Sequence, residues 1–142
     1  MDTAVENLDC RAEAQGLAEE SLTGEIISAA IAVHRQLGPG LFESAYQASL
    51  CHELALRKIA FRPQVDLPVR YKGVQLDCGY RLDLIVEDRV VVELKSIDNL
   101  AAIHEAQLMT YLRLSGIHVG LLINFNVQVL KDGIRRLVHG ET

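Results

Sequence analysis

Residues 80–95 read YRLDLIVEDRVVVELK, two apolar runs on either side of the charged triplet 87–89. The three consecutive valines at 90–92 are typical of a central strand, because β-branched side chains pack well on a buried sheet. A short charged turn between two apolar runs favours a hairpin. We therefore expect strands over residues 74–86 and 89–94, joined by this turn.

The same hairpin carries charged residues where a buried strand normally has none. Side chains alternate between the two faces of a strand, so Glu93 and Lys95 share a face. A three-residue loop puts Val86 opposite Val90. Asp83 then lies directly across from Glu93. The pattern predicts that two carboxylates and one ammonium group converge.

Two carboxylates a few ångströms apart repel each other, so such a pair either shares a proton or binds a cation. We favour a divalent metal, because hard oxygen ligands with few histidines suit Mg²⁺ or Mn²⁺. The pattern leaves one alternative open. Glu93 and Lys95 can form a buried ion pair, with Asp83 as an independent turn or cap residue.

The chain has 142 residues, of which 49% are hydrophobic and 23% charged, as in an ordinary globular protein. Residues 1–22 hold six acidic residues and one arginine, whereas the remainder is balanced in charge and shows no basic excess for nucleic acid. We interpret residues 1–22 as an acidic leader, flexible or marginally helical, and residues 23–142 as a single domain. The three cysteines are far apart and form no C-x-x-C pair, so they cannot hold a four-cysteine zinc or iron–sulfur site within one chain. The longest uncharged apolar stretch, residues 26–33, is too short to span a bilayer, so we expect a cytoplasmic protein without membrane association.

The remaining elements follow from apolar periodicity and turn residues. We expect helices over residues 23–37, 41–58 and 99–115, and strands over residues 65–71, 117–125, 127–130 and 134–138, the last two forming a hairpin. Two helices, three strands, a helix and three strands then follow one another. This order predicts an α/β fold, an α+β sandwich in which helices flank a mixed central β-sheet.

Four ordered motifs resemble those of a known enzyme family. Asp83 with Glu93-Leu94-Lys95 resembles the D…(D/E)-x-K signature of the PD-(D/E)XK nuclease superfamily. Residues 40–46, GLFESAY, resemble the G-x-x-E-x-x-Y motif of its GxxExxY branch. Residues 105–112 and 120–125 resemble the later E-x-Q…Y-L and G-x-L-x-N-F segments of that branch. The resemblance covers about residues 25–138 and implies a restriction-endonuclease-like core.

The resemblance also implies a set of metal ligands. Asp83 and Glu93 would be the principal ligands, and the backbone carbonyl of Leu94 would be a further oxygen. Glu43, on the helix before the sheet, would add an acid to the site. The alternative for Glu43 is an acid in the first turn of a helix, where the helix dipole favours it.

Two further roles follow from the same resemblance. Lys95 would position or help to deprotonate the attacking water, and it would stabilise the charge of the transition state. Gln107 would assist the site from the helix after the core strand, with Tyr111 one turn later on the same face.

Nucleic-acid contacts are expected from aromatic and basic side chains. Tyr46 and Tyr111 can stack on bases, and apolar packing of the ring is the alternative. Arg62 and Lys72 belong to a basic segment around the first strand and can contact phosphates, and a solvated face is the alternative. We interpret His104 as a surface or boundary residue.

The sequence therefore predicts a Mg²⁺- or Mn²⁺-dependent nuclease that acts on DNA or RNA, and we favour DNA over RNA as the partner. By analogy with small junction-resolving enzymes of the superfamily, we expect a homodimer. The alternative function is a non-catalytic nuclease-fold module that binds nucleic acid or a protein partner. A phosphohydrolase for free nucleotides is disfavoured, because the chain has no G-x-x-x-x-G-K-[ST] phosphate loop.

Overall fold

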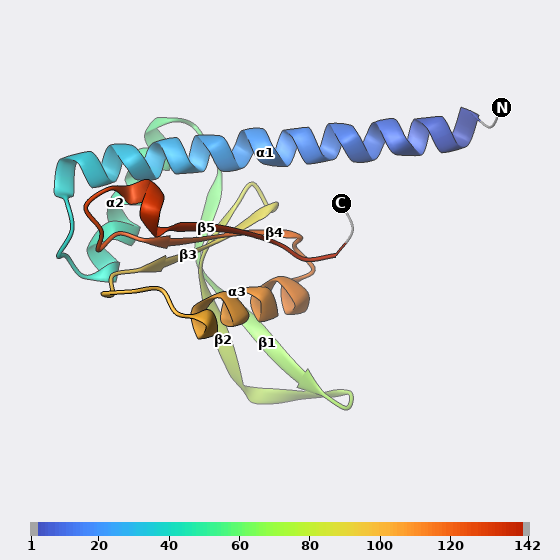
Figure 1. The fold of residues 1–142 in the computed structure, drawn as a ribbon. Coiled ribbons are helices and arrows are strands. Elements are labelled where there is room, and N and C mark those ends of the chain that lie inside the picture. Colours follow the sequence, from blue (N-terminus) through green and yellow to red (C-terminus); the bar gives the residue numbers. More distant parts are fainter. Residues whose placement is uncertain (1–2, 141–142) are drawn as a thin grey trace.

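A single five-stranded mixed sheet organises the fold, with its strands in the order β1-β2-β3-β4-β5 (Figure 1). The computed structural model describes residues 3–140, and the side chains of residues 19–140. The elements are α1 (Thr3–Leu37), α2 (Glu43–Leu56), β1 (Phe61–Tyr71), β2 (Val74–Val86), β3 (Val90–Lys95), α3 (Ala102–Ser115), β4 (Val119–Asn124), the 3₁₀ helix η1 (Leu130–Gly133) and β5 (Ile134–Val138). The predicted α+β architecture is confirmed.

The pairing of the strands explains why the sheet is mixed. β1, β2 and β3 form an antiparallel meander, and β4 and β5 are also antiparallel. β3 and β4 are parallel, and α3 makes the long connection that a parallel pair requires. The long β1–β2 hairpin extends beyond the helices at its far end (Figure 1). β3 therefore lies in the centre of the sheet, between β2 and β4.

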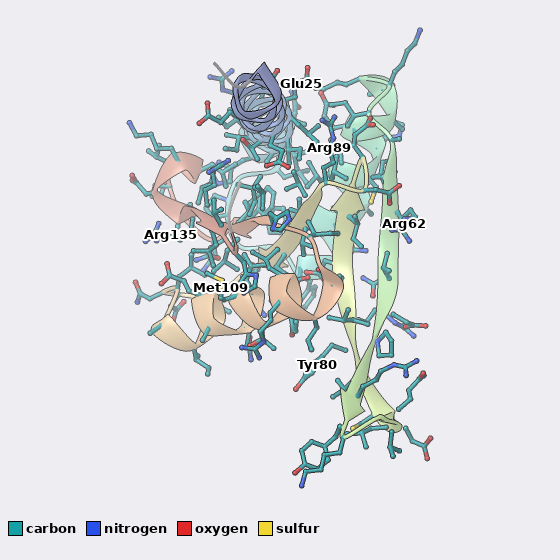
Figure 2. The ribbon with its side chains drawn as sticks, turned by 90° about the vertical axis from the view of Figure 1, so that its right-hand side faces the viewer. Glu25, Arg62, Tyr80, Arg89, Met109 and Arg135 are labelled. Carbon is teal, nitrogen blue, oxygen red and sulfur yellow. The ribbon has the colours of Figure 1, made fainter. Side chains whose placement is uncertain are left out.

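Each face of the sheet has its own hydrophobic core, and the two cores lie between the sheet and different helices. Leu50 and Leu54 of α2 and Ile26 of α1 pack with the β3 residues Val90 and Val92 on one face. On the other face, the core consists of Leu67, Leu82, Ile85, Val91, Leu108, Leu112 and Leu122, which include two residues of α3. Figure 2 shows α1 and α3 on opposite sides of the sheet. Alternate residues of β3 therefore face different helices.

The first helix begins much earlier than the sequence pattern indicates. We expected it to start at Thr23, but α1 runs without interruption from Thr3 to Leu37. Thr23 is not an N-cap, because its hydroxyl donates a hydrogen bond to the carbonyl of Glu20 within the helix (2.9 Å). Residues 3–22 are thus helical in continuity with the helix that packs on the sheet, whereas their separation from the domain stays a prediction. Although α1 is long, neither it nor any other helix in the described part of the chain is apolar enough to cross a membrane.

The predicted hairpin after β4 is wrong in its first strand. Residues 127–130 form no strand, and β5 pairs directly with β4. The carbonyl of Val127 interacts with Nε2 of His34 (2.8 Å) instead of with a neighbouring strand. Gly133 passes so close to the end of β4 that an added Cβ would clash with the Asn124 carbonyl oxygen. The segment is therefore a tight crossing that brings β5 alongside β4, although its alternating sequence resembles a strand.

Tyr46 fixes the start of α2, and this placement disagrees with its predicted role in base stacking. Its ring has no exposed surface and stacks on Phe125, with centroids 4.4 Å apart. Its hydroxyl donates a hydrogen bond to the Gly38 carbonyl (2.5 Å) and accepts one from the Leu41 N–H (3.2 Å). A ring enclosed in this way cannot stack on a base. Tyr46 instead closes the turn around Gly40, whose φ of 97° favours glycine.

The substitution Tyr46→Phe should therefore destabilise the protein while keeping the ring stack. We expect the free energy of unfolding to fall by about 1 kcal/mol, because the Gly38 carbonyl and the Leu41 N–H lose their partner. Urea denaturation measures this, with Tyr71→Phe on an exposed tyrosine as the matched control. An unchanged unfolding midpoint in Tyr46→Phe would contradict the role assigned to the hydroxyl.

Candidate metal centre

The predicted hairpin register is confirmed. Val86 pairs with Val90, and Leu84 pairs with Val92. The regular backbone pairs of β2 and β3 end there. Beyond them, carboxylate oxygens accept the hydrogen bonds that backbone carbonyls would accept in a regular ladder. The Asp83 N–H donates a hydrogen bond to Glu93 Oε1 (3.1 Å). The two carboxylates that the sequence predicts are therefore brought together at the end of the β2–β3 ladder.

The reciprocal bond comes from the opposite strand. The Leu94 N–H donates to Asp83 Oδ2 (2.9 Å), so each acid accepts a backbone hydrogen bond from the other strand. In a strand, the N–H and the carbonyl of one residue point to the same edge. The Leu94 carbonyl is thus directed toward β2, as is its N–H. This edge of β3 presents oxygen atoms from a side chain and from the backbone.

Glu93 is the most perturbed acid of the described residues. Only 7% of its surface is exposed, and its pKa is raised from 4.5 to about 8. Burial of the carboxylate is the main cause, and the neighbouring charge of Asp83 is the second. The backbone hydrogen bond from Asp83 and the charge of Lys95 act in the opposite direction. The pair therefore favours either a proton or a cation between the two acids.

Lys95 lies at the end of β3, where the parallel pairing with β4 holds the backbone. It pairs with Asn124, and its carbonyl accepts a hydrogen bond from the Phe125 N–H (2.9 Å). Its side chain is half-buried, and its charge lowers the pKa of Glu93. The predicted convergence of an ammonium group with the two acids agrees with this effect.

Asn124 is a positioning residue to which the sequence analysis gave no role, although it belongs to the G-x-L-x-N-F segment. It is buried, and its Oδ1 accepts hydrogen bonds from the N–H groups of Ile97 (3.1 Å) and Asn126 (3.2 Å). Its Nδ2 donates to the Ile97 carbonyl (2.9 Å). The Ser96 hydroxyl also donates to the Leu41 carbonyl (2.5 Å), which ties the same loop to the start of α2. A polar residue at the end of the apolar strand 119–124 was the available signal.

Glu43 is the first residue of α2 and is exposed. It lines an open pocket of about 420 Å³ together with Phe42 and Ser96, close to the end of β3. Within residues 19–140, no three His, Cys, Asp or Glu side chains lie close enough to hold a metal ion. Glu43 is therefore not gathered with Asp83 and Glu93 in this conformation. Its position also fits an acid in the first turn of a helix.

α3 brings Tyr111 beside the acid pair. The pKa of Tyr111 is raised, first by burial and then by the charge of Glu93, with smaller effects of Tyr80 and Asp83. The rings of Tyr80 and Tyr111 lie 5.4 Å apart, and Tyr80 is a second residue that the sequence analysis missed. Its position three residues before Asp83 was the only signal. Gln107 lies one turn before Tyr111 and is exposed, and its assisting role stays a prediction.

The two predicted phosphate contacts lie at opposite ends of β1. Arg62 donates two hydrogen bonds to Asp88 Oδ1 (3.1 and 2.8 Å), and both side chains are exposed. The Lys72 ammonium lies over the Tyr71 ring, 5.4 Å from its centroid. Arg62 and Lys72 therefore do not form one basic patch. His104 Nδ1 accepts a hydrogen bond from the Ala101 N–H (2.8 Å) and so caps α3, in agreement with its interpretation as a boundary residue.

A comparison with protein families shows to which superfamily the chain belongs. Residues 20–137 match the PD-(D/E)XK nuclease superfamily. The chain belongs to this superfamily. No curated protein and no solved structure shows a significant match to the chain.

The superfamily assignment explains the donor set of the hairpin. The predicted assignment of Asp83 as the aspartate of the PD-(D/E)XK signature, Glu93 as its second acid and Lys95 as its lysine lies within the matched residues and stays a prediction. Nucleases of the superfamily generally use divalent metals. Carboxylate and carbonyl oxygens are the ligands that Mg²⁺ and Mn²⁺ prefer, so the residues present fit such an ion. The restriction-endonuclease-like fold that the resemblance implied is confirmed.

The raised pKa of Glu93 predicts how the stability of the metal-free protein depends on pH. Above about pH 4.5 the unfolded chain loses the Glu93 proton, whereas the folded chain keeps it up to about pH 8. Rising pH in this window therefore destabilises the fold. We expect the free energy of unfolding of the wild type to fall between about pH 5 and about pH 8 relative to that of Glu93→Gln.

Urea titrations of both proteins in the presence of a chelator measure this difference. When Mn²⁺ replaces the chelator, the free energy of unfolding of the wild type near pH 8 should rise again, because the metal binds the deprotonated acid. Parallel pH profiles of the wild type and Glu93→Gln would contradict the assignment of the raised pKa to Glu93.

Proposed function

We propose that this chain is a Mg²⁺- or Mn²⁺-dependent nuclease that hydrolyses phosphodiester bonds in DNA or RNA, and we favour DNA as the partner. The observation that carries the proposal is the opposed pair of Asp83 and Glu93, with Lys95 at the end of the same strand. Electrostatic repulsion in a buried site makes the pair a strong acceptor for a hard cation. We further propose that the chain belongs to the GxxExxY branch and acts as a cytoplasmic homodimer.

Asp83 and Glu93 would hold the ion from two adjacent strands, with the Leu94 carbonyl directed to the same edge. Their backbone hydrogen bonds fix both carboxylates before any ion is present, so little reorganisation is needed on binding. When bound, a divalent metal polarises the phosphoryl oxygen and lowers the pKa of water.

Lys95 would act on the reacting atoms. Its ammonium group can donate hydrogen bonds to the attacking water and to the non-bridging phosphate oxygens, where negative charge develops. The loop held by Asn124 limits the movement of the strand end that carries Lys95. Gln107 would assist from α3 on the same side of the sheet.

Glu43 would be a weaker, supporting ligand from the start of α2. Its pocket adjoins Ser96, the residue after Lys95, and the Ser96 hydroxyl ties the two segments together. Because Glu43 is exposed, losing its charge should affect metal affinity less than losing that of Asp83.

A calorimetric Mn²⁺ titration tests the metal site. We expect Asp83→Asn and Glu93→Gln each to weaken binding by more than about 100-fold, because even outer partners of metal ligands contribute about 10- to 100-fold. Glu43→Gln should weaken it less. Asp77→Asn, an exposed acid on the same strand, is the matched control and should bind as the wild type does.

Two outcomes would contradict this site. Equal and negligible heats in all variants and the wild type would remove the metal claim and favour the non-catalytic module. A larger loss in Glu43→Gln than in Asp83→Asn would reverse the ranking of the ligands.

Lys95→Ala separates chemistry from metal binding. We expect kcat for cleavage of a DNA oligonucleotide to fall by about 100- to 1000-fold, because the variant loses a group that stabilises transition-state charge. Mn²⁺ affinity should change little, as measured by calorimetry. Lys131→Ala, on an exposed lysine of η1, is the matched control. Wild-type turnover in Lys95→Ala would assign Lys95 a structural role.

A further inference from the structure

Tyr80 and Tyr111 form an aromatic pair that the proposed chemistry does not use. Tyr80 lies on β2 and Tyr111 on α3, with ring centroids 5.4 Å apart and an interplanar angle of 50°. Figure 2 shows Tyr80 on the side of β2 that faces α3. Half of the Tyr80 surface remains exposed, whereas Tyr111 is partly buried against the core that includes Leu108 and Leu112. Tyr80 thus contacts Tyr111 and still leaves half of its own surface exposed.

The backbone of Tyr80 is paired with the neighbouring strand. Tyr80 pairs with Leu67 across the β1–β2 ladder. At the preceding Gly79, an added Cβ would lie 3.0 Å from the Leu67 carbonyl oxygen, so the two strands approach closely there. The first part of β2, residues 74–81, is exposed, whereas residues 82–86 are buried or half-buried. Tyr80 therefore stands at the border between the packed domain and the protruding hairpin.

The aromatic pair borders the acid pair. Tyr80 precedes Asp83 by three residues on the same strand, and the charges of Glu93 and Asp83 both raise the pKa of Tyr111. Three residues of a strand span about 10 Å, so Tyr80 and Asp83 lie about that far apart along β2. Because the nearby carboxylates repel other phosphates, the uncharged base is the part of the nucleotide that can lie against Tyr80.

The kind of nucleic acid follows from the geometry of stacking. Base stacking on an aromatic side chain is tolerant of sequence, because every base has a π face. In a duplex both faces of each internal base are already covered by neighbouring bases, whereas a single strand, a flap or a frayed end exposes them. We infer that Tyr80, supported by Tyr111, is a stacking platform for an unpaired nucleotide, so that the substrate is single-stranded or locally unpaired nucleic acid. This inference rests on the proposed nuclease function.

Binding to the full-length Lys95→Ala chain in the presence of Mn²⁺ tests the inference with hydrolysis slowed, because this variant should keep its metal affinity. Fluorescence anisotropy compares a labelled oligothymidine with a blunt-ended duplex of the same length. We expect the additional change Tyr80→Ala to weaken binding of the single strand by about tenfold, within the range for one stacked base, and to leave duplex binding unchanged. Tyr80→Phe, which keeps the ring, should bind as the parent does.

Tyr71→Ala is the matched control. Tyr71 is an exposed tyrosine on the same hairpin, at its far end and about 20 Å from Tyr80 along the ribbon. Its loss should leave the affinity for the single strand unchanged. Because Tyr80 is half exposed, Tyr80→Ala should keep the fold, and circular dichroism verifies this.

Intrinsic fluorescence gives a second readout, independent of affinity. The chain has four tyrosines and no tryptophan, so its emission comes from tyrosine. Stacking of a base on Tyr80 should quench part of this emission when the oligothymidine binds. Tyr80→Phe should lose most of the quenching while it keeps the affinity, and undiminished quenching in this variant would contradict the stack.

The outcomes separate this inference from the proposed function. Equal losses for single strand and duplex in Tyr80→Ala, or no loss for the single strand, would overturn the platform and leave the nuclease proposal standing. Tight single-strand binding through Tyr80 without metal-dependent cleavage by the wild type would support the platform and favour the non-catalytic module. Failure to bind either oligonucleotide would overturn both.

Discussion

The reciprocal hydrogen bonds between β2 and β3 are the interaction on which the site depends. Each of the two acids, Asp83 and Glu93, accepts a backbone N–H from the opposite strand, where a ladder carbonyl would otherwise accept it. The carboxylates therefore continue the strand pairing after the regular ladder ends, and they are held close together as a result. Among the side chains that the structure describes, no buried polar atom lacks a hydrogen-bond partner. Each acid of the pair thus accepts one backbone hydrogen bond from the other strand, and the neighbouring charge of Asp83 still opposes ionisation of Glu93, which a cation would relieve.

The rest of the fold keeps this pair in a buried, fixed position. β3 lies between β2 and β4, and the cores on its two faces exclude water from Glu93, which is the main reason for its raised pKa. Beyond β3, Asn124 and Ser96 hold the loop by hydrogen bonds to backbone groups, so the strand end that carries Lys95 is fixed as well. Residues of one hairpin and one helix would then perform three tasks. They would bind the metal, stabilise the charge of the transition state and contact an unpaired nucleotide.

The sequence predicted the centre of the structure better than its periphery. A three-residue loop leaves one register for the hairpin, so Asp83 and Glu93 could be placed opposite each other from residue spacing alone. Tertiary contacts decided the rest. Tyr46 is buried because Phe125, distant in sequence, covers its ring, and residues 127–130 cross the end of β4 instead of forming a strand. The hydrogen bonds of Asn124 and the ring contact of Tyr80 join distant segments, and no local pattern reports them. The helix start predicted at Thr23 was wrong, because Thr23 resembles an N-cap in sequence but lies inside α1, where its hydroxyl donates to the Glu20 carbonyl.

Anomalous diffraction from a crystal of the full chain soaked in Mn²⁺ tests the central claim most directly, because it locates the ion without relying on activity. The account predicts one strong anomalous peak at the end of the β2–β3 ladder, about 2.0–2.3 Å from carboxylate oxygens of both Asp83 and Glu93. A peak elsewhere, or density showing both carboxylates unchanged at saturating Mn²⁺ with no ion between them, would contradict it.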